Sequence, residues 1–95
     1  SGFNVSPNEI EDAISVIPGV VQVGVIGMPD DKTGEAPAAF VVKNDDALDA
    51  NAIIEGCRDS LTNYKIPRRV EFVDDVPVTL SGKVLRRELR ESYLK

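Results

Sequence analysis

Two short runs of apolar residues, separated by a polar turn, constrain the fold of this chain most strongly. The first run extends from Val20 to Met28 and the second from Ala36 to Lys43. Between them, residues 29–34 are rich in Pro, Asp and Gly, which favour turns. Short runs with many β-branched residues are typical of strands. We therefore predict two strands, paired antiparallel, with apolar residues on both faces.

Helical patterns precede and follow this pair of strands. Ser6 can cap a first helix, Pro7 suits its first position, and Glu9 completes a capping box. Apolar residues then recur at helical spacing, at Ile10, Ala13, Ile14 and Ile17. Asp49 can cap a second helix. The expected apolar face of this helix consists of Ile53, Ile54, Cys57 and Leu61.

A third strand and a third helix are expected near the end of the chain. The short apolar run Val70–Val73 predicts the strand. The helix is predicted to begin at about Val84, with Leu85, Leu89 and Tyr93 facing inward and Arg86, Arg87 and Arg90 facing largely outward. This order of elements predicts an α+β fold, with a small mixed sheet of about three strands packed by three helices. The remnant of a hairpin is expected at the N-terminal end.

The composition limits the chemistry that the chain can perform by itself. The 95 residues suffice for one domain, and 42% hydrophobic with 28% charged residues indicate a globular one. No His and a single Cys argue against a Ser-His-Asp triad, a zinc site and an internal disulfide, and suit a reducing compartment. Cys57 lies on an apolar helical stripe, so we interpret it as a core residue. No apolar run approaches the roughly 20 residues of a membrane-spanning helix.

Charge is distributed unevenly along the chain. The net charge is −5, but residues 1–63 carry three Lys or Arg against eleven Asp or Glu, whereas residues 64–95 carry eight against five. The basic end is therefore either an anion-facing surface or a solvated helix face. Because the chain as a whole is acidic and aromatic residues are not interleaved with the basic ones, we do not expect it to bind nucleic acid.

Two motifs in the basic end are candidates for binding an anionic ligand. The first is Ser-Gly-Lys at residues 81–83, where a flexible turn presents the cation of Lys83. It is not a phosphate-binding P-loop, because Pro77 stands where that motif needs Gly and Val84 stands where it needs Ser or Thr. The second is the segment Tyr64–Arg69, an aromatic residue with three cations, which suits either a nucleotide or an ordinary basic turn.

Five stretches of the chain resemble, in order, the C-terminal domain of the adenylate-forming enzymes. This family includes acyl-CoA synthetases, nonribosomal peptide adenylation domains and firefly luciferase. The stretches are residues 1–11 (SGFNVSPNEIE), 18–20 (PGV), 34–37 (GEAP), 64–67 (YKIP) and 77–90 (PVTLSGKVLRRELR). The first is most similar to bacterial long-chain fatty acid-CoA ligases. The resemblance implies that residues 1–95 are the small C-terminal lid domain of a longer ligase, whose large N-terminal domain binds ATP and the acyl group.

The resemblance also implies a two-step reaction. A fatty acid and ATP give an acyl-adenylate and pyrophosphate, and CoA then displaces AMP to give the acyl-CoA. Between the steps, the lid rotates and presents a different face to the large domain. ATP and Mg²⁺ are bound mainly by the large domain, and CoA is the co-substrate. The chain by itself is therefore expected to be inactive.

Individual residues receive roles from the same resemblance. Lys83 matches the adenylation lysine, which stabilises the charge that develops between the substrate carboxylate and the α-phosphate. Gly2 and Phe3 match the loop that lines the pantetheine channel, and Tyr64 and Arg68 match positions that contact the CoA nucleotide. At Ile66 some relatives carry Arg, so Lys65 or Arg69 is expected to supply the missing cation.

The resemblance places the enzyme in the cytoplasm, working on long-chain substrates at the inner face of the bacterial inner membrane. Its partners are then its own large domain, the fatty acid, ATP and CoA. Two alternatives stay open. The chain can be the lid of another adenylate-forming enzyme, which uses another acyl group or transfers it to a carrier protein. It can also be a non-catalytic module that binds nucleotides or a partner through its basic face.

Overall fold

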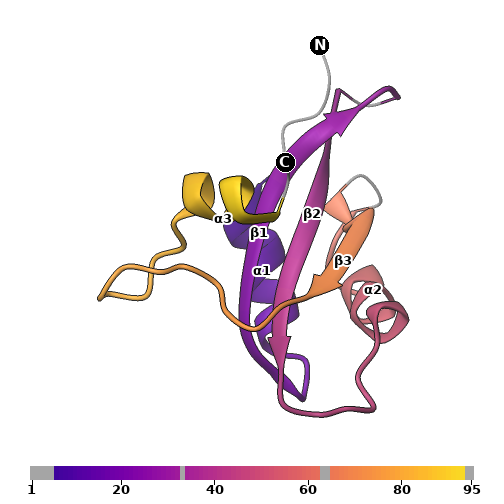
Figure 1. The fold of residues 1–95 in the computed structure, drawn as a ribbon. Coiled ribbons are helices and arrows are strands. Elements are labelled where there is room, and N and C mark those ends of the chain that lie inside the picture. Colours follow the sequence, from indigo (N-terminus) through magenta and orange to yellow (C-terminus); the bar gives the residue numbers. More distant parts are fainter. Residues whose placement is uncertain (1–5, 33, 63–64, 94–95) are drawn as a thin grey trace.

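A hairpin of two long strands forms the centre of the structure, a computed structural model that describes residues 6–32, 34–62 and 65–93 (Figure 1). Strand β1 (Val20–Asp30) pairs antiparallel with β2 (Gly34–Lys43), which confirms the predicted pair. Both strands extend into the predicted turn, so that Asp30 lies opposite Gly34. Gly34 adopts a φ of 85°, which glycine accepts without strain.

A third strand makes the sheet mixed. Strand β3 (Arg69–Phe72) pairs parallel with β2, and the strand order is β1-β2-β3. Helix α2 (Ala50–Arg58) lies in the crossover that a parallel pair requires. β3 begins one residue earlier than predicted, and the N–H of Val73 just beyond it still donates to Val41 O at 2.9 Å. The predicted α+β class with a mixed sheet of three strands is confirmed.

Helices cover both faces of the sheet, which explains why both faces of its strands are apolar (Figure 1). Helices α1 (Pro7–Ser15) and α2 pack on one face, and α3 (Arg86–Tyr93) packs on the other. The core of the first face includes Ile10, Ile14, Val25, Ala39, Val41, Ile53 and Cys57. The core of the second face includes Ile26, Ala38, Phe40 and Leu89. Alternate residues of each strand therefore belong to opposite cores.

The N-terminal ends of α1 and α2 differ in how they are capped. Asp49 caps α2 as predicted, since its Oδ1 accepts a hydrogen bond from the N–H of Ala52 at 2.8 Å. The capping box predicted for α1 is wrong, because the Ser6 side chain makes no capping hydrogen bond. Glu9 instead forms an ion pair with Lys65, whose Nζ lies 2.9 Å from Glu9 Oε1. A cation from a distant part of the chain has replaced the local partner.

Helix α3 begins at Arg86, two residues later than predicted. Val84 instead forms a β-bridge with Val78. The N–H of the next residue, Leu85, donates to Pro77 O at 2.9 Å. Residues 78–84 therefore form a small hairpin in front of the helix.

The predicted hairpin remnant at residues 1–5 lies outside the described residues, as do Gly2 and Phe3 of the predicted pantetheine channel and Tyr64 of the predicted nucleotide site. Within the described ranges, no helix is long and apolar enough to cross a membrane. The predicted site residues within the described ranges are therefore Lys83, Lys65, Arg68 and Arg69.

Candidate functional site

Lys83 lies on a hairpin that projects beyond the body of the domain (Figure 1). We call residues 78–84 the Lys83 hairpin. The N–H of Thr79 donates to Lys83 O at 2.8 Å, and the N–H of Gly82 donates to Thr79 O at 2.9 Å. Gly82 adopts a φ of 89°, as is usual for the last residue of a three-residue hairpin loop. The glycine before Lys83 is therefore required by the turn.

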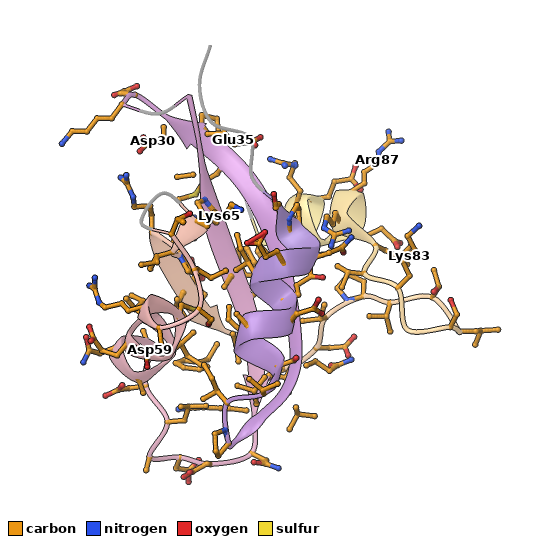
Figure 2. The ribbon with its side chains drawn as sticks, turned by 180° about the vertical axis from the view of Figure 1, so that it is seen from behind. Asp30, Glu35, Asp59, Lys65, Lys83 and Arg87 are labelled. Carbon is orange, nitrogen blue, oxygen red and sulfur yellow. The ribbon has the colours of Figure 1, made fainter. Side chains whose placement is uncertain are left out.

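The side chain of Lys83 is exposed and points away from the body of the domain (Figure 2). Among the described residues, its ammonium group has neither an ion-pair nor a hydrogen-bond partner. Its backbone, by contrast, is fixed, because its N–H donates to Thr79 Oγ1 at 3.0 Å. Thr79 Oγ1 also lies 3.0 Å from Ser81 Oγ. The hairpin thus presents a cation without a counter-charge on a hydrogen-bonded loop.

The base of the Lys83 hairpin and helix α3 pack onto β1 at Gly24. A Cβ atom at Gly24 would lie 2.7 Å from Leu89 Cδ2, 2.9 Å from Val76 Cγ1 and 3.3 Å from Val84 Cγ1. Contacts below 3.0 Å would force the Leu89 and Val76 side chains to move, so glycine lets these side chains pack closely on the strand. Val76 and Leu89 are fully buried there. The hairpin is therefore anchored in the core although its tip is exposed.

Glu11 and Arg86 bind the outer edge of β1 at Val25. Glu11 Oε2 accepts a hydrogen bond from the N–H of Val25 at 2.8 Å, and Arg86 Nε donates to Val25 O at 3.0 Å. Arg86 Nη2 also donates to the two Glu11 oxygens at 2.9 and 3.0 Å, and to Asn8 Oδ1 at 2.9 Å. We call Glu11, Val25 and Arg86 the edge clamp. The prediction that Arg86 faces outward is wrong, because these acceptors draw its guanidinium group against the strand.

Of the two charged side chains in the edge clamp, that of Glu11 is the more buried. The Glu11 side chain is 13% exposed, against 29% for Arg86. Burial raises the pKa of Glu11, while the N–H of Val25 and the charge of Arg86 oppose the rise. Removing one member of such a pair leaves the other charge without compensation in a poorly solvated place.

The predicted CoA-facing cations lie just before and at the start of β3, at the sheet edge opposite β1 (Figure 1). We call Lys65, Arg68 and Arg69 the basic edge. The ion pairs of these residues are Lys65 with Glu9 at 2.9 Å, Arg68 with Asp30 at 3.6 Å, and Arg69 with Glu71. All three pairs are partly exposed, and such pairs typically contribute only about 0–1 kcal/mol to stability. The cations are therefore available to exchange their carboxylate partners for another anion.

Ile66 and Pro67 are buried beneath the basic edge. Ile66 is 9% exposed and belongs to the core that α1 and α2 cover. Packing therefore accounts for an apolar residue at this position. A groove of about 300 Å³ lies beside it and is lined by Ile54, Arg58, Ile66, Pro67 and Arg68. Its apolar floor and its two cations suit a ligand that has both an apolar face and an anionic group.

The structure thus separates the predicted residues into two groups at opposite edges of the sheet. Lys83 belongs to one group, and the basic edge forms the other. Nowhere in the described ranges do three or more His, Cys, Asp or Glu side chains gather in a way that could hold a metal ion. Cys57 is buried in the core as predicted, and burial raises the pKa of its thiol, which favours the unreactive form.

Local sequence patterns did not predict the roles of Gly24 and of the edge clamp. A glycine within a run of Val and Ile is a signal for a close approach of another element, and it could have identified Gly24. Glu11 and Arg86 carried no such signal, because they are far apart in the sequence and each lies on a helix face that its own spacing predicts to be polar.

Comparison with known proteins finds one family that matches most of this chain. Residues 9–83 match the family described as AMP-binding enzyme C-terminal domain. A long-chain-fatty-acid–CoA ligase of Escherichia coli O6:H1 is 50% identical over 91 residues, which are 96% of this chain and 16% of that protein. The structure of a Mycobacterium tuberculosis fatty acyl CoA synthetase is 44% identical, with a TM-score of 0.86 over 96% of this chain and 18% of that one. ATP-bound MatB from Rhodopseudomonas palustris is 41% identical, with a TM-score of 0.84 and the same coverage.

The chain spans about a sixth of the length of these relatives. The family match includes the basic edge and ends at Lys83. The structural similarity extends over nearly the whole chain, at identities well above those at which only a fold is shared. The chain therefore belongs to the family of AMP-binding enzyme C-terminal domains.

Proposed function

We propose that this chain is the C-terminal lid domain of a long-chain fatty acid–CoA ligase and that Lys83 is its adenylation lysine. The observation that carries the proposal is the exposed ammonium group of Lys83, for which the described part of the chain supplies no counter-charge. Its anionic partners are then the substrate carboxylate and the α-phosphate of ATP, both held by the large domain. The names of the relatives support the choice of a fatty acid as substrate.

Lys83 acts in this proposal by its charge alone. When the carboxylate oxygen attacks the α-phosphorus, a new P–O bond forms, the bond to the pyrophosphate oxygen breaks, and pyrophosphate leaves. An ammonium group placed between the carboxylate and the α-phosphate stabilises the charge that develops there. The long, flexible stem of Lys lets the charge reach into a site built by another domain. No proton has to leave Lys83.

The basic edge serves the second half-reaction in this proposal. The CoA thiol gives up its proton to solvent and its sulfur attacks the acyl carbon. The C–S bond of the thioester forms, the acyl C–O bond to the phosphate breaks, and AMP leaves. Lys65, Arg68 and Arg69 have the chemistry to bind the CoA phosphates in place of their carboxylate partners. We propose that Tyr64 contacts the CoA nucleotide and that Gly2 and Phe3 line the pantetheine channel. Two groups at opposite sheet edges suit a domain that rotates between two steps.

ATP and Mg²⁺ are proposed to bind mainly outside this chain. An ATP-bound relative supports the nucleotide. The described residues form no acidic cluster for a metal ion, so we assign no step to Mg²⁺ through this chain. We further propose a cytoplasmic enzyme that meets its long-chain substrate at the inner face of the inner membrane.

The first test compares the chain alone with the complete enzyme that contains it. We expect the chain alone to form no acyl-CoA, and the complete enzyme to convert a long-chain fatty acid, ATP and CoA to acyl-CoA, AMP and pyrophosphate. The acyl acceptor is tested by offering CoA and a holo-acyl carrier protein in parallel. Turnover by the chain alone would overturn the lid assignment, and preference for the carrier protein would overturn the assignment of CoA.

A further inference from the structure

The edge clamp satisfies backbone groups that an edge strand leaves unpaired. β1 is an edge strand of the sheet, so the outward N–H and C=O groups of its residues have no neighbouring strand. At Val25, a carboxylate accepts from the N–H and a guanidinium group donates to the C=O. The ion pair therefore binds the strand edge in the way that a further strand would, and it does so through the fork of Arg86, which makes several directed hydrogen bonds at once.

The edge clamp also joins two helices that the sheet separates. Glu11 belongs to α1 and Arg86 to α3, and these helices pack on opposite faces. The pair reaches around the edge of β1, where the two side chains meet at 2.9 Å. Arg86 is the first residue of α3, so the clamp fixes the point at which the chain enters that helix.

The entry to α3 is also where the Lys83 hairpin returns to the sheet. Arg86 follows Lys83 by three residues, and the two residues between them are tied to the other arm of the hairpin, at Val78 and Pro77. The first arm leaves β1 at Val76, whose N–H lies 3.4 Å from Gln22 Oε1. Between these two anchors, the described tip of the hairpin is exposed. The direction of the hairpin, and with it the position of Lys83, is therefore set at its base.

We propose that Arg86, held by Glu11 and Val25, is a positioning residue that fixes where Lys83 lies during adenylation. This inference rests on the role of Lys83 proposed above. A displacement of about 1 Å at a reacting group costs on the order of a hundredfold in rate. Without the edge clamp, the base of the hairpin would be held to β1 by apolar contacts at Gly24 and by the long hydrogen bond from Val76 to Gln22, which would be a poor support for a catalytic cation. The thioester step, which uses the other edge of the sheet, does not depend on the hairpin.

The test uses the complete enzyme with four variants. Arg86→Met removes the charge and the donors but keeps an apolar stem, Arg86→Lys keeps the charge but loses the fork, and Glu11→Gln removes the carboxylate charge. Arg87→Met is the matched control, because Arg87 is the exposed neighbouring residue with the same charge. Adenylation is followed by ATP–pyrophosphate exchange, and the second step by acyl-CoA formation from added acyl-adenylate.

Arg86→Met is expected to lower kcat for adenylation by roughly ten- to a hundredfold with little change in KM for ATP, since binding by the large domain is untouched. The rate from added acyl-adenylate is expected to stay within about twofold. Arg86→Lys should recover part of the loss, and Glu11→Gln should show a smaller loss of the same kind. Arg87→Met should leave both steps unchanged.

Equal losses in both steps would show that Arg86 only supports the fold, and an unchanged adenylation rate would show that the hairpin needs no clamp; either result overturns the inference. If Arg86→Met does not fold, Arg86→Lys and Glu11→Gln decide by the same comparison of steps.

Lys83→Ala is measured in the same assays. If this substitution does not slow adenylation more than the thioester step, the proposed role of Lys83 is wrong. If Lys83→Ala slows adenylation selectively and the Arg86 variants do not, only the proposed positioning role of Arg86 is wrong.

Discussion

Glycine is favoured at Gly24, beneath the Lys83 hairpin, and at Gly82, within it, but for different physical reasons. A Cβ atom at Gly24 would lie within 3 Å of the Leu89 and Val76 side chains, whereas one at Gly82 would meet no atom within 4 Å. Gly82 instead has a φ of 89°, which strains any residue with a side chain. Crowding therefore selects glycine inside the domain, and backbone conformation selects it at the tip of the hairpin.

Alanine substitutions separate these two reasons. Gly82→Ala is expected to lower the free energy of unfolding by about 1 kcal/mol, because only the backbone is strained. Gly24→Ala is expected to lower it by about 1–3 kcal/mol, because Leu89 and Val76 must move in a packed core. Denaturant unfolding of the chain measures both values. A Gly24→Ala chain as stable as the wild type would contradict the close packing at β1.

The raised pKa of Glu11 predicts how the stability of the chain depends on pH. Burial raises its pKa above the ordinary value, so the folded chain holds this proton more tightly than the unfolded chain. The resulting contribution to stability is complete below the unfolded pKa and is lost as the pH rises through the higher, folded pKa. The unfolding free energy of the wild type, relative to Glu11→Gln, should therefore fall as the pH rises through and above the ordinary pKa of a glutamate carboxyl group. A difference that rises over this range would contradict the burial of the carboxyl group.

At the scale of elements, most of the secondary structure could be predicted from local patterns. The β1–β2 hairpin, the cap at Asp49 and the third strand all follow from residues that lie close together in the sequence. Two of the errors occur where a distant residue competes for a local partner. Glu9 forms an ion pair with Lys65 instead of completing the predicted capping box. Arg86 donates a hydrogen bond to the edge of β1 instead of facing the solvent. A single sequence does not reveal such long-range partners.

The different caps of α1 and α2 give a prediction at this scale. Asp49→Ala is expected to lower the free energy of unfolding by about 1 kcal/mol, because the N–H of Ala52 loses its acceptor. Ser6→Ala is the control and should change it by no more than a few tenths of a kcal/mol, since the Ser6 side chain makes no capping hydrogen bond. Urea unfolding of both variants measures these two changes in the free energy of unfolding. Equal losses would mean that Ser6 also caps its helix.

At the scale of the whole molecule, the sheet keeps two working groups apart. The Lys83 hairpin is anchored at β1, and the basic edge lies at β3. The sequence alone identified the candidate cations, because their motifs are local. These cations are Lys83, Lys65, Arg68 and Arg69. Their separation at opposite edges of the sheet could not be predicted in this way, because it depends on the strand order. The ion pairs of Lys65 and Arg68 could not be predicted either, since their partners Glu9 and Asp30 lie far away in the sequence.

The central claim is that the two groups serve different half-reactions, and the most direct measurement is the effect of Lys83→Ala on each step in the complete enzyme. We predict that ATP–pyrophosphate exchange falls by about a hundredfold or more, while acyl-CoA formation from added acyl-adenylate stays within about twofold of the wild type. Arg90→Ala, which removes an exposed cation of α3, should leave both rates unchanged. Equal losses of the two rates on Lys83→Ala, or no loss in the first, would contradict the claim.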